Sequence, residues 1–368
     1  MLVGAVFVPL VIKKFTIYDL RFTIYEKDSL PITGITFLFL GLLIGIFVSS
    51  DMQTSLGVFK GWFLAPVLFA ITTRSVLVEE KQKQKALWSL ALSGISVAVI
   101  SFFYWIFGWL TFDGRLAAFY ESPNMLAMYV TPALLIVTLA LTYDLRLTTY
   151  DKKLINNKSL VVGRWSLVVF SFSFLIFSLV MARSLGAFIG ITAAGLFYLS
   201  TLYWGKYMDK LGRIVIVSII FIGILLPFPS ILFNPWEMGR TSLASRLMIW
   251  QASVEMLKNN WLFGIGPGMF QETYLAYQKN FSPFLEWAVP HPHNIFLATW
   301  LYGGLIGLVG LLLILFWFFS KLQKISTNIY QYLLLSIIIY LLIHGTIDNT
   351  LWRNDMAMVF WMMMALRR

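Results

Sequence analysis

Long apolar segments, separated by short polar breaks, constrain the fold of this chain most strongly. They lie at about residues 1–12, 32–50, 58–77, 86–107, 124–142, 165–182, 185–204, 213–228, 294–319, 329–345 and 355–366. About 20 apolar residues in a helix cross the roughly 30 Å of a bilayer's hydrocarbon layer. Lipid offers no hydrogen-bond partners to the backbone, and the alternating pattern of barrel strands is absent, so the segments should be helical. We therefore predict an all-α, polytopic transmembrane helix bundle with about 11 spans, forming a single integral membrane domain over residues 1–368.

The composition agrees with a membrane location. Only 12% of the residues are charged and 59% are hydrophobic, whereas soluble domains are about 25% charged. The chain has no cysteine, which excludes disulfides and thiolate metal sites. Lys13 and Lys14 follow the first apolar run in place of a small-residue cleavage site, so we expect no cleavable signal peptide. That run is too short to cross a bilayer alone, and we expect a further helix to precede it in the natural protein.

The distribution of basic residues predicts the topology. If alternate loops lie on alternate sides, 20 of the 28 lysine and arginine residues fall on one side, which the positive-inside rule assigns to the cytoplasm. The other eight are Lys60, Arg115, Arg183, Arg240, Arg246, Lys258, Lys279 and Arg353. The net charge of +11 is thus mainly a topology signal, and nucleic-acid binding is not expected. Five of the eight outer residues are arginines, whose planar fork suits a diphosphate or a carboxylate better than a lysine ammonium does; this predicts a site for an anionic ligand on the outer face.

The longest interval without an apolar span is residues 229–292, which this topology places outside the membrane as a large extracytoplasmic loop. Within it, residues 242–261 have apolar side chains at helical spacing and Ser242 as a candidate N-cap, which predicts an amphipathic helix on the bundle or in the headgroup layer. Gly264, Gly266 and Gly268 do not have the spacing of a dinucleotide-binding loop. We expect them to form a tight bend after the helix.

The chain has three histidines, His291, His293 and His344. Histidine changes protonation near neutral pH and is the most frequent general base. His291 and His293 flank a proline, which is a weak metal-binding pattern, and no spacing rule supports a set of further ligands. We therefore expect no metal site. Arg183 interrupts two apolar runs that are joined by almost no loop, and a charge at such a position commonly marks function.

Several motifs, in this order, resemble those of the bacterial O-antigen ligase and O-antigen polymerase family. The central ones are Ser245-Arg246-Leu247-x-x-Trp250, Gly264-x-Gly266-x-Gly268-x-Phe270, and His293-Asn294-x-Phe296-Leu297 followed by Gly303-Gly304. The flanking ones are Gly114-Arg115 with Pro123-Asn124-x-x-Ala127, Ala182-Arg183-Ser184-x-Gly186-Ala187, and His344-x-x-x-Asp348. The family has about twelve spans and a large outer loop late in the chain.

The resemblance implies a metal-independent, inverting glycosyltransferase without a cofactor in the bacterial cytoplasmic membrane. It would transfer a glycan from an undecaprenyl-diphosphate carrier to a hydroxyl of a glycan, lipid A-core or protein acceptor at the extracytoplasmic face. His293 matches the histidine that activates the acceptor, and Arg183 and Arg246 match the arginines that bind the diphosphate, with Arg115 on the same face. The further candidate site residues are His291, Asn294, Arg240, Asn124, His344 and Asp348.

The residues themselves leave other interpretations open. The subclasses of transferase (ligase, polymerase or protein glycosyltransferase) are not separated. A polytopic transporter or lipid-linked glycan flippase also has many spans. Such a protein would be expected to hold charges near the middle of the bilayer on broken helices and often to show inverted repeats. In this sequence the notable charges gather at one predicted face, and no internal repeat is evident.

Overall fold

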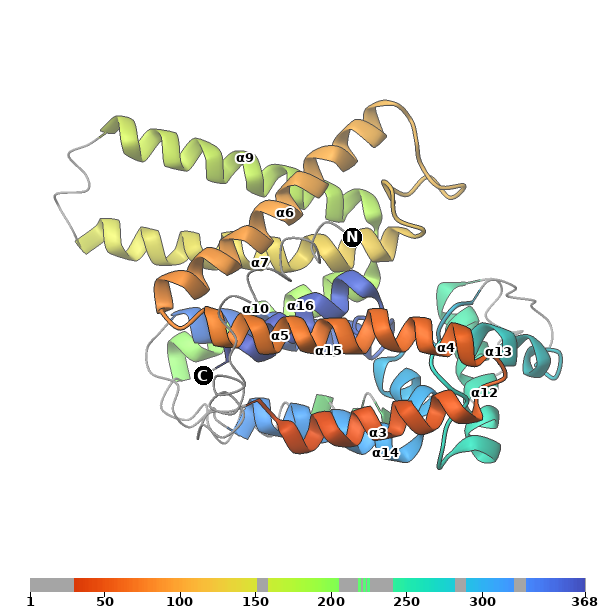
Figure 1. Ribbon diagram of the computed structural model, residues 1–368. Coiled ribbons are helices and arrows are strands. Elements are labelled where there is room, and N and C mark those ends of the chain that lie inside the picture. The colour runs from red at the N-terminus through yellow and green to blue at the C-terminus, as the bar shows by residue number, and fades with distance from the viewer. Residues whose placement is uncertain are drawn as a thin grey trace. The chain divides into compact units, whose positions relative to one another are not determined.

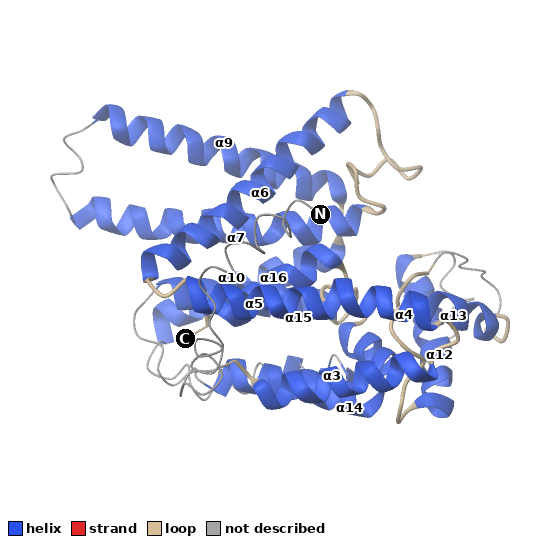
Figure 2. Cartoon of the chain, in the orientation of Figure 1, coloured by secondary structure: helices blue, strands red, loops and turns tan. Residues whose placement is uncertain are grey.

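The computed structural model describes residues 30–150, 158–204, 218–219, 221–222, 224–225, 241–281, 289–320 and 329–367. Within these ranges the chain forms helices and connecting loops and no strand, which confirms the all-α prediction (Figure 2). The predicted apolar run 1–12 and the basic segment after it lie outside the described residues, as does most of the run 213–228.

Among the described residues, three helical segments are long and apolar enough to cross a membrane: Met52–Val76, Glu80–Ile106 and Ile295–Ser320. Shorter apolar helices cover Ile32–Val48, Pro123–Thr138, Ser166–Ala182, Leu185–Ser200, Tyr330–Gly345 and Asn354–Leu366. Each of these matches a predicted apolar run. The chain is thus a helical integral membrane protein, while the number of spans and the side on which each loop lies remain predictions.

The chain divides into two compact units. The first comprises Met1–Val78, Val215–Gln323 and Gly345–Arg368, and the second comprises Glu79–Ile214 and Lys324–His344.

In the first unit, α3 (Ile32–Val48) and α14 (Ile295–Ser320) lie side by side (Figure 1). Their contact is lined with glycines. A Cβ placed on Gly41 would stand 2.4 Å from the backbone nitrogen of Gly307, and one on Gly310 would stand 2.3 Å from that of Leu38. Small residues at such spacing let two membrane helices approach until their backbones touch. This close packing holds α14, the helix that follows the candidate histidines, firmly against α3.

Helix α14 is interrupted at Gly304, whose φ of 64° is not helical. The predicted glycine bend after α12 (Ser242–Asn260) fills this interruption. Ile265 donates its N–H to the Leu301 carbonyl at 2.6 Å, and Leu305 donates its N–H to the carbonyls of Trp261 and Leu262, both at 3.1 Å. Non-helical backbone is tolerated at membrane depth only where protein groups take up its hydrogen bonds. Gly264, Gly266 and Gly268 all have positive φ, so the tight bend is confirmed.

Helix α12 differs from its prediction in two respects. Its N-cap is Thr241 and not Ser242, because the Thr241 hydroxyl accepts the Ala244 N–H at 3.1 Å. Its middle is also buried on nearly all sides and not along one stripe. Ser253 is fully buried although it is polar, whereas the apolar Leu243 and Trp261 are exposed. The middle of the helix is covered by its own unit, through α13 (Phe270–Gln278) and α14, and polar side chains such as Lys258 are exposed toward its ends.

Two further helical segments among the described residues of the first unit pack on each other. Met52–Val76 is continuous through α4 (Met52–Val58), the π-helical η1 (Phe59–Leu64) and α5 (Ala65–Val76), and Asp51 caps its start. It packs on α16 (Asn354–Leu366). Arg74 is buried and donates to the carbonyls of Ala365 and Arg367, at 3.1 and 2.6 Å, which satisfies the end of α16.

The second unit contains α6 (Glu80–Ile106), α7 (Pro123–Tyr150), α9 (Lys158–Ala182), α10 (Leu185–Trp204) and α15 (Ile329–Gly345, whose last residue belongs to the first unit). Helices α6, α7 and α9 pack on one another, with buried Ser101 of α6 bonded to Ser178 of α9 at 2.7 Å. Gly190 and Gly186 of α10 lie against Tyr340 and His344 of α15, respectively.

Candidate active site

His293 stands at the entrance of α14 in an unusual backbone conformation. Its φ is 48°, a left-handed value that few residues other than glycine adopt. The next residue, Asn294, caps α14, because its Oδ1 accepts the N–H groups of Phe296 and Leu297, each at 2.9 Å. Strain of this kind persists only where the surroundings hold it. The cap therefore fixes the direction in which the His293 side chain leaves the helix end.

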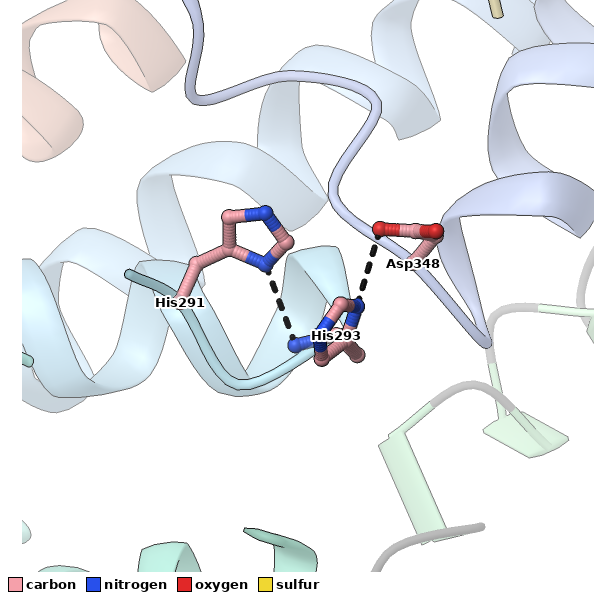
Figure 3. A group of neighbouring side chains, drawn as sticks. All are labelled: His291, His293 and Asp348. Carbon is pink, nitrogen blue, oxygen red and sulfur yellow. Dashed lines mark hydrogen bonds and ion pairs between the residues drawn. The ribbon is translucent and has the colours of Figure 1, made fainter. Parts of the chain in front are cut away.

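The carboxylate of Asp348 meets the His293 ring. Nδ1 of His293 and Oδ1 of Asp348 are 3.0 Å apart, and Asp348 lies almost completely buried in the loop that precedes α16 (Figure 3). A carboxylate accepts hydrogen bonds, so it favours the tautomer with the proton on Nδ1. Nε2 is then left as an acceptor on a side chain that is 24% exposed. This is the arrangement of an oriented general base.

Arg246 joins the same cluster from α12. Its Nε donates to the Ile347 carbonyl at 2.8 Å, and its Nη1 bonds the carbonyl and the hydroxyl of Ser242, one turn earlier on the helix. Its Nη2 is 3.8 Å from Oδ2 of Asp348. Because each of its three nitrogens has a partner, the guanidinium is held in place as a positive charge beside the candidate base.

His291 completes the group on the other side of His293. The His293 backbone N–H donates to Nδ1 of His291 at 3.4 Å, and the two rings meet edge-on with centroids 4.5 Å apart (Figure 3). Burial lowers the pKa of His291 to about 3, aided by the nearby His293, Arg353 and Arg246, and opposed by Asp348. At neutral pH this imidazole is therefore uncharged and carries its proton on Nε2.

Two neighbouring side chains hold these loops in place. Trp250 was not predicted as a site residue, and Asn294 was predicted without a role. Trp250 of α12 donates its indole N–H to the Pro292 carbonyl at 2.9 Å. Asn294 donates its amide to the Thr346 carbonyl, also at 2.9 Å. The Trp250 contact was missed because a tryptophan on a helical stripe is usually read as core, although its place in the Arg246 motif was a signal.

The cluster also contains residue types that bind metal ions. His291, His293 and Asp348 place one ligand-type atom each within 4.8 Å of one another. However, Nδ1 of His293 and Oδ1 of Asp348 already share a hydrogen bond. The other Asp348 oxygen faces the positive charge of Arg246, which disfavours a second cation. The donor set therefore fits acid–base chemistry better than a resident metal ion.

The other predicted residues fall into two groups. Arg115, Asn124, Arg183 and His344 belong to the second compact unit. Arg240 lies outside the described residues. The first unit alone brings together Arg246, His291, His293, Asn294 and Asp348.

Within the second unit, Arg183 forms the turn between α9 and α10, with a φ of 48° and an exposed side chain. Arg115 lies in the loop after α6, where its Nε contacts Oδ2 of Asp113 at 2.6 Å. Asn124 lies in the first turn of α7. His344 is buried, its Nδ1 is 2.9 Å from the Tyr340 hydroxyl, and it packs on Gly186. Its position thus indicates a role in joining α10 to α15.

The fold and this cluster define a helical integral membrane protein with a histidine, a carboxylate and an arginine gathered at one helix entrance. Residues 170–312 match the family model described as O-antigen ligase, which confirms the resemblance seen in the motifs. No curated protein matches the chain. The matched segment includes Arg183, Arg246, His291, His293 and Asn294 but ends before Asp348 and does not include Arg115. The match shows similarity to O-antigen ligases over this segment, which is less than half of the chain.

Proposed function

We propose that the protein is a membrane glycosyltransferase that moves a glycan from undecaprenyl diphosphate to an acceptor hydroxyl at the outer face of the bacterial cytoplasmic membrane. An O-antigen ligase-like reaction is the first candidate and O-antigen polymerisation the second. The observation that carries the proposal is the His293–Asp348 hydrogen bond at 3.0 Å beside the Arg246 guanidinium. The O-antigen ligase match over residues 170–312 supports the same reaction class.

His293 acts as the general base in this proposal. As the acceptor oxygen attacks the anomeric carbon, its proton passes to Nε2 of His293, and the resulting imidazolium is stabilised by Asp348. General-base catalysis of this kind contributes about 10²- to 10⁴-fold to a rate. Asp348 orients the ring and keeps the accepting nitrogen free.

Arginines stabilise the leaving group. The bond between the anomeric carbon and the diphosphate oxygen breaks, and its electron pair remains on the diphosphate as negative charge. A fixed guanidinium in a partly dehydrated site stabilises such developing charge strongly. Arg246 is held for this role by Ile347 and Ser242. Arg183 and Arg115 are proposed as further diphosphate ligands, on the strength of the motif resemblance and their predicted side of the membrane.

The reaction needs neither a metal nor a cofactor in this proposal. The cleaved bond between the anomeric carbon and the diphosphate supplies the driving force, and the arginines supply the positive charge that a metal ion would otherwise provide. A single displacement from the face opposite the diphosphate inverts the anomeric configuration. The donor's lipid tail requires entry from the bilayer, which accords with a site at the membrane surface.

The decisive test incubates the purified protein, in lipid nanodiscs, with an undecaprenyl-diphosphate-linked glycan and candidate acceptors, and identifies the product by mass. The expected result is an acceptor–glycan conjugate and free undecaprenyl diphosphate. His293→Gln should lower the rate by about 100-fold or more while the protein inserts and folds normally. Movement of the lipid-linked glycan across the bilayer without a covalent product would instead show a flippase and overturn the proposal.

A further inference from the structure

Asn294 uses both ends of its side-chain amide, although it is fully buried. The oxygen accepts the N–H groups of Phe296 and Leu297 and so caps α14. The nitrogen donates to the Thr346 carbonyl at 2.9 Å. A cap alone does not require asparagine, because serine, threonine and aspartate cap helices about equally well. Of these residue types, only asparagine can accept from the helix start and also donate an amide N–H to a second segment.

The two segments that Asn294 joins are the ones that carry the candidate base and its carboxylate. His293 directly precedes Asn294, and Asp348 follows Thr346 by two residues. The Asn294–Thr346 hydrogen bond therefore spans the same pair of loops as the His293–Asp348 hydrogen bond. The left-handed backbone of His293 adds to the need for support, because a strained residue relaxes when its surroundings loosen.

We propose that Asn294 is a positioning residue that locks the loop of His293 to the loop of Asp348 and so sets the geometry of the base. Its effect on glycan transfer rests on the function proposed above. Its effect on the geometry of His293 does not rest on that function, since the His293–Asp348 hydrogen bond is present in the protein without substrate.

The test is the matched pair Asn294→Ser and Thr299→Val. Asn294→Ser keeps an N-cap but cannot donate an amide to Thr346. Thr299 accepts the Trp352 indole N–H at 2.8 Å and so also joins α14 to the loop before α16, without touching the histidine. Thr299→Val is thus a control for losing one buried hydrogen bond between the same two segments.

The first readout is the histidine NMR spectrum of the full-length, nitrogen-15-labelled protein in nanodiscs. Only three histidines are present, and His293→Gln assigns the signal of interest. The wild type and Thr299→Val should show the deshielded Nδ1–H proton of a histidine bonded to a carboxylate. Asn294→Ser should lose that signal or move it toward the position of a solvent-exposed imidazole.

The second readout is transfer kinetics. Displacing the base by a fraction of an ångström lowers the rate of the chemical step. Asn294→Ser should therefore reduce kcat by about 10- to 100-fold and leave the donor KM nearly unchanged. If Asn294→Ser does not retain the fold, Asn294→Asp serves in its place, because it also caps α14 and cannot donate to Thr346.

An unchanged Nδ1–H signal in the Asn294 variant overturns the positioning role, as does an equal loss of the signal in Thr299→Val, which would indicate general loosening. A changed signal in Asn294→Ser alone supports it. If wild-type protein transfers no glycan but the signal still changes as expected, the proposed function fails and the positioning role stands.

Discussion

Nδ1 of His293 and Oδ1 of Asp348 are 3.0 Å apart, although 55 positions separate the two residues in the chain. Asp348→Asn keeps the size of the side chain but removes the charge that stabilises an imidazolium. We expect kcat for glycan transfer to fall by about 100-fold or more, measured with purified protein at saturating donor. Asp355→Asn is the matched control, since Asp355 pairs with Arg353 at the start of α16. Comparable losses in both variants would contradict a specific role for Asp348.

Arg246→Lys keeps one positive charge on α12 but loses the planar fork that reaches Ile347, Ser242 and Asp348 at once. A lysine ammonium is not held in the same place, so we expect the donor KM to rise by about 10-fold and kcat to fall as well. Lys258→Ala, which removes an exposed cation on the same helix, should behave like the wild type. Unaltered donor kinetics in Arg246→Lys would argue against diphosphate binding at this residue.

Arg183→Lys tests the second proposed diphosphate ligand. The side chain is exposed, so the substitution should leave the thermal unfolding temperature close to that of the wild type. Loss of the bidentate fork should nevertheless lower transfer strongly, by about 10-fold or more in kcat/KM. Full activity at low donor concentration would remove Arg183 from the proposed site.

Metal dependence separates the two chemical interpretations of the histidine cluster. Dialysis against a chelator should leave transfer unchanged. Added zinc should inhibit, because the ion would take the nitrogens of His291 and His293 and the carboxylate of Asp348, which occupies the base. The measurement is the transfer rate against zinc concentration, with His291→Gln expected to require more zinc. Activity that is lost with the chelator and restored by zinc would show that the acid–base interpretation is wrong.

The lowered pKa of His291 predicts a pH dependence of stability. Its pKa is about 3 in the folded protein and about 6.5 in an unfolded chain, so between these values the unfolded state binds the extra proton. Stability should therefore fall as the pH drops from about 6.5 toward 3, with a slope of at most about 1.4 kcal/mol per pH unit from this residue. His291→Gln should flatten that part of the curve when the unfolding temperature is measured against pH. An identical curve for the variant would show that the folded and unfolded states bind the same number of protons at His291, and hence that folding does not lower its pKa.

The helices could be predicted well because membrane spans depend on the hydrophobicity of consecutive residues, which can be read directly from the sequence. Runs such as 294–319 and 185–204 become α14 and α10 almost residue for residue. The turn at Arg183 could be predicted for the same reason, since two apolar runs meet there without a loop. His293 and Arg246 could be singled out through motif resemblance and their residue types.

What the sequence did not predict depends on contacts between distant segments. The partnership of Asp348 with His293 arises because the loops before α14 and α16 meet, and no spacing rule connects residues so far apart. The burial of Ser253 on α12 was missed because periodicity reports polarity along one helix and not which neighbours cover it. The one-residue error in the cap of α12 reflects two adjacent hydroxyl residues, Thr241 and Ser242, that are equally suitable by composition.

The interruption of α14 at Gly304 has a consequence for how the protein is made. A span released into lipid with an uncovered carbonyl or N–H carries a penalty of several kcal/mol for each such group. The groups around Gly304 are covered only when Trp261, Leu262 and Ile265 dock against them, and these residues are synthesised before α14. We therefore expect the insertion of this helix to be coupled to the folding of the segment ahead of it, so that the candidate site at the start of α14 forms as the helix inserts.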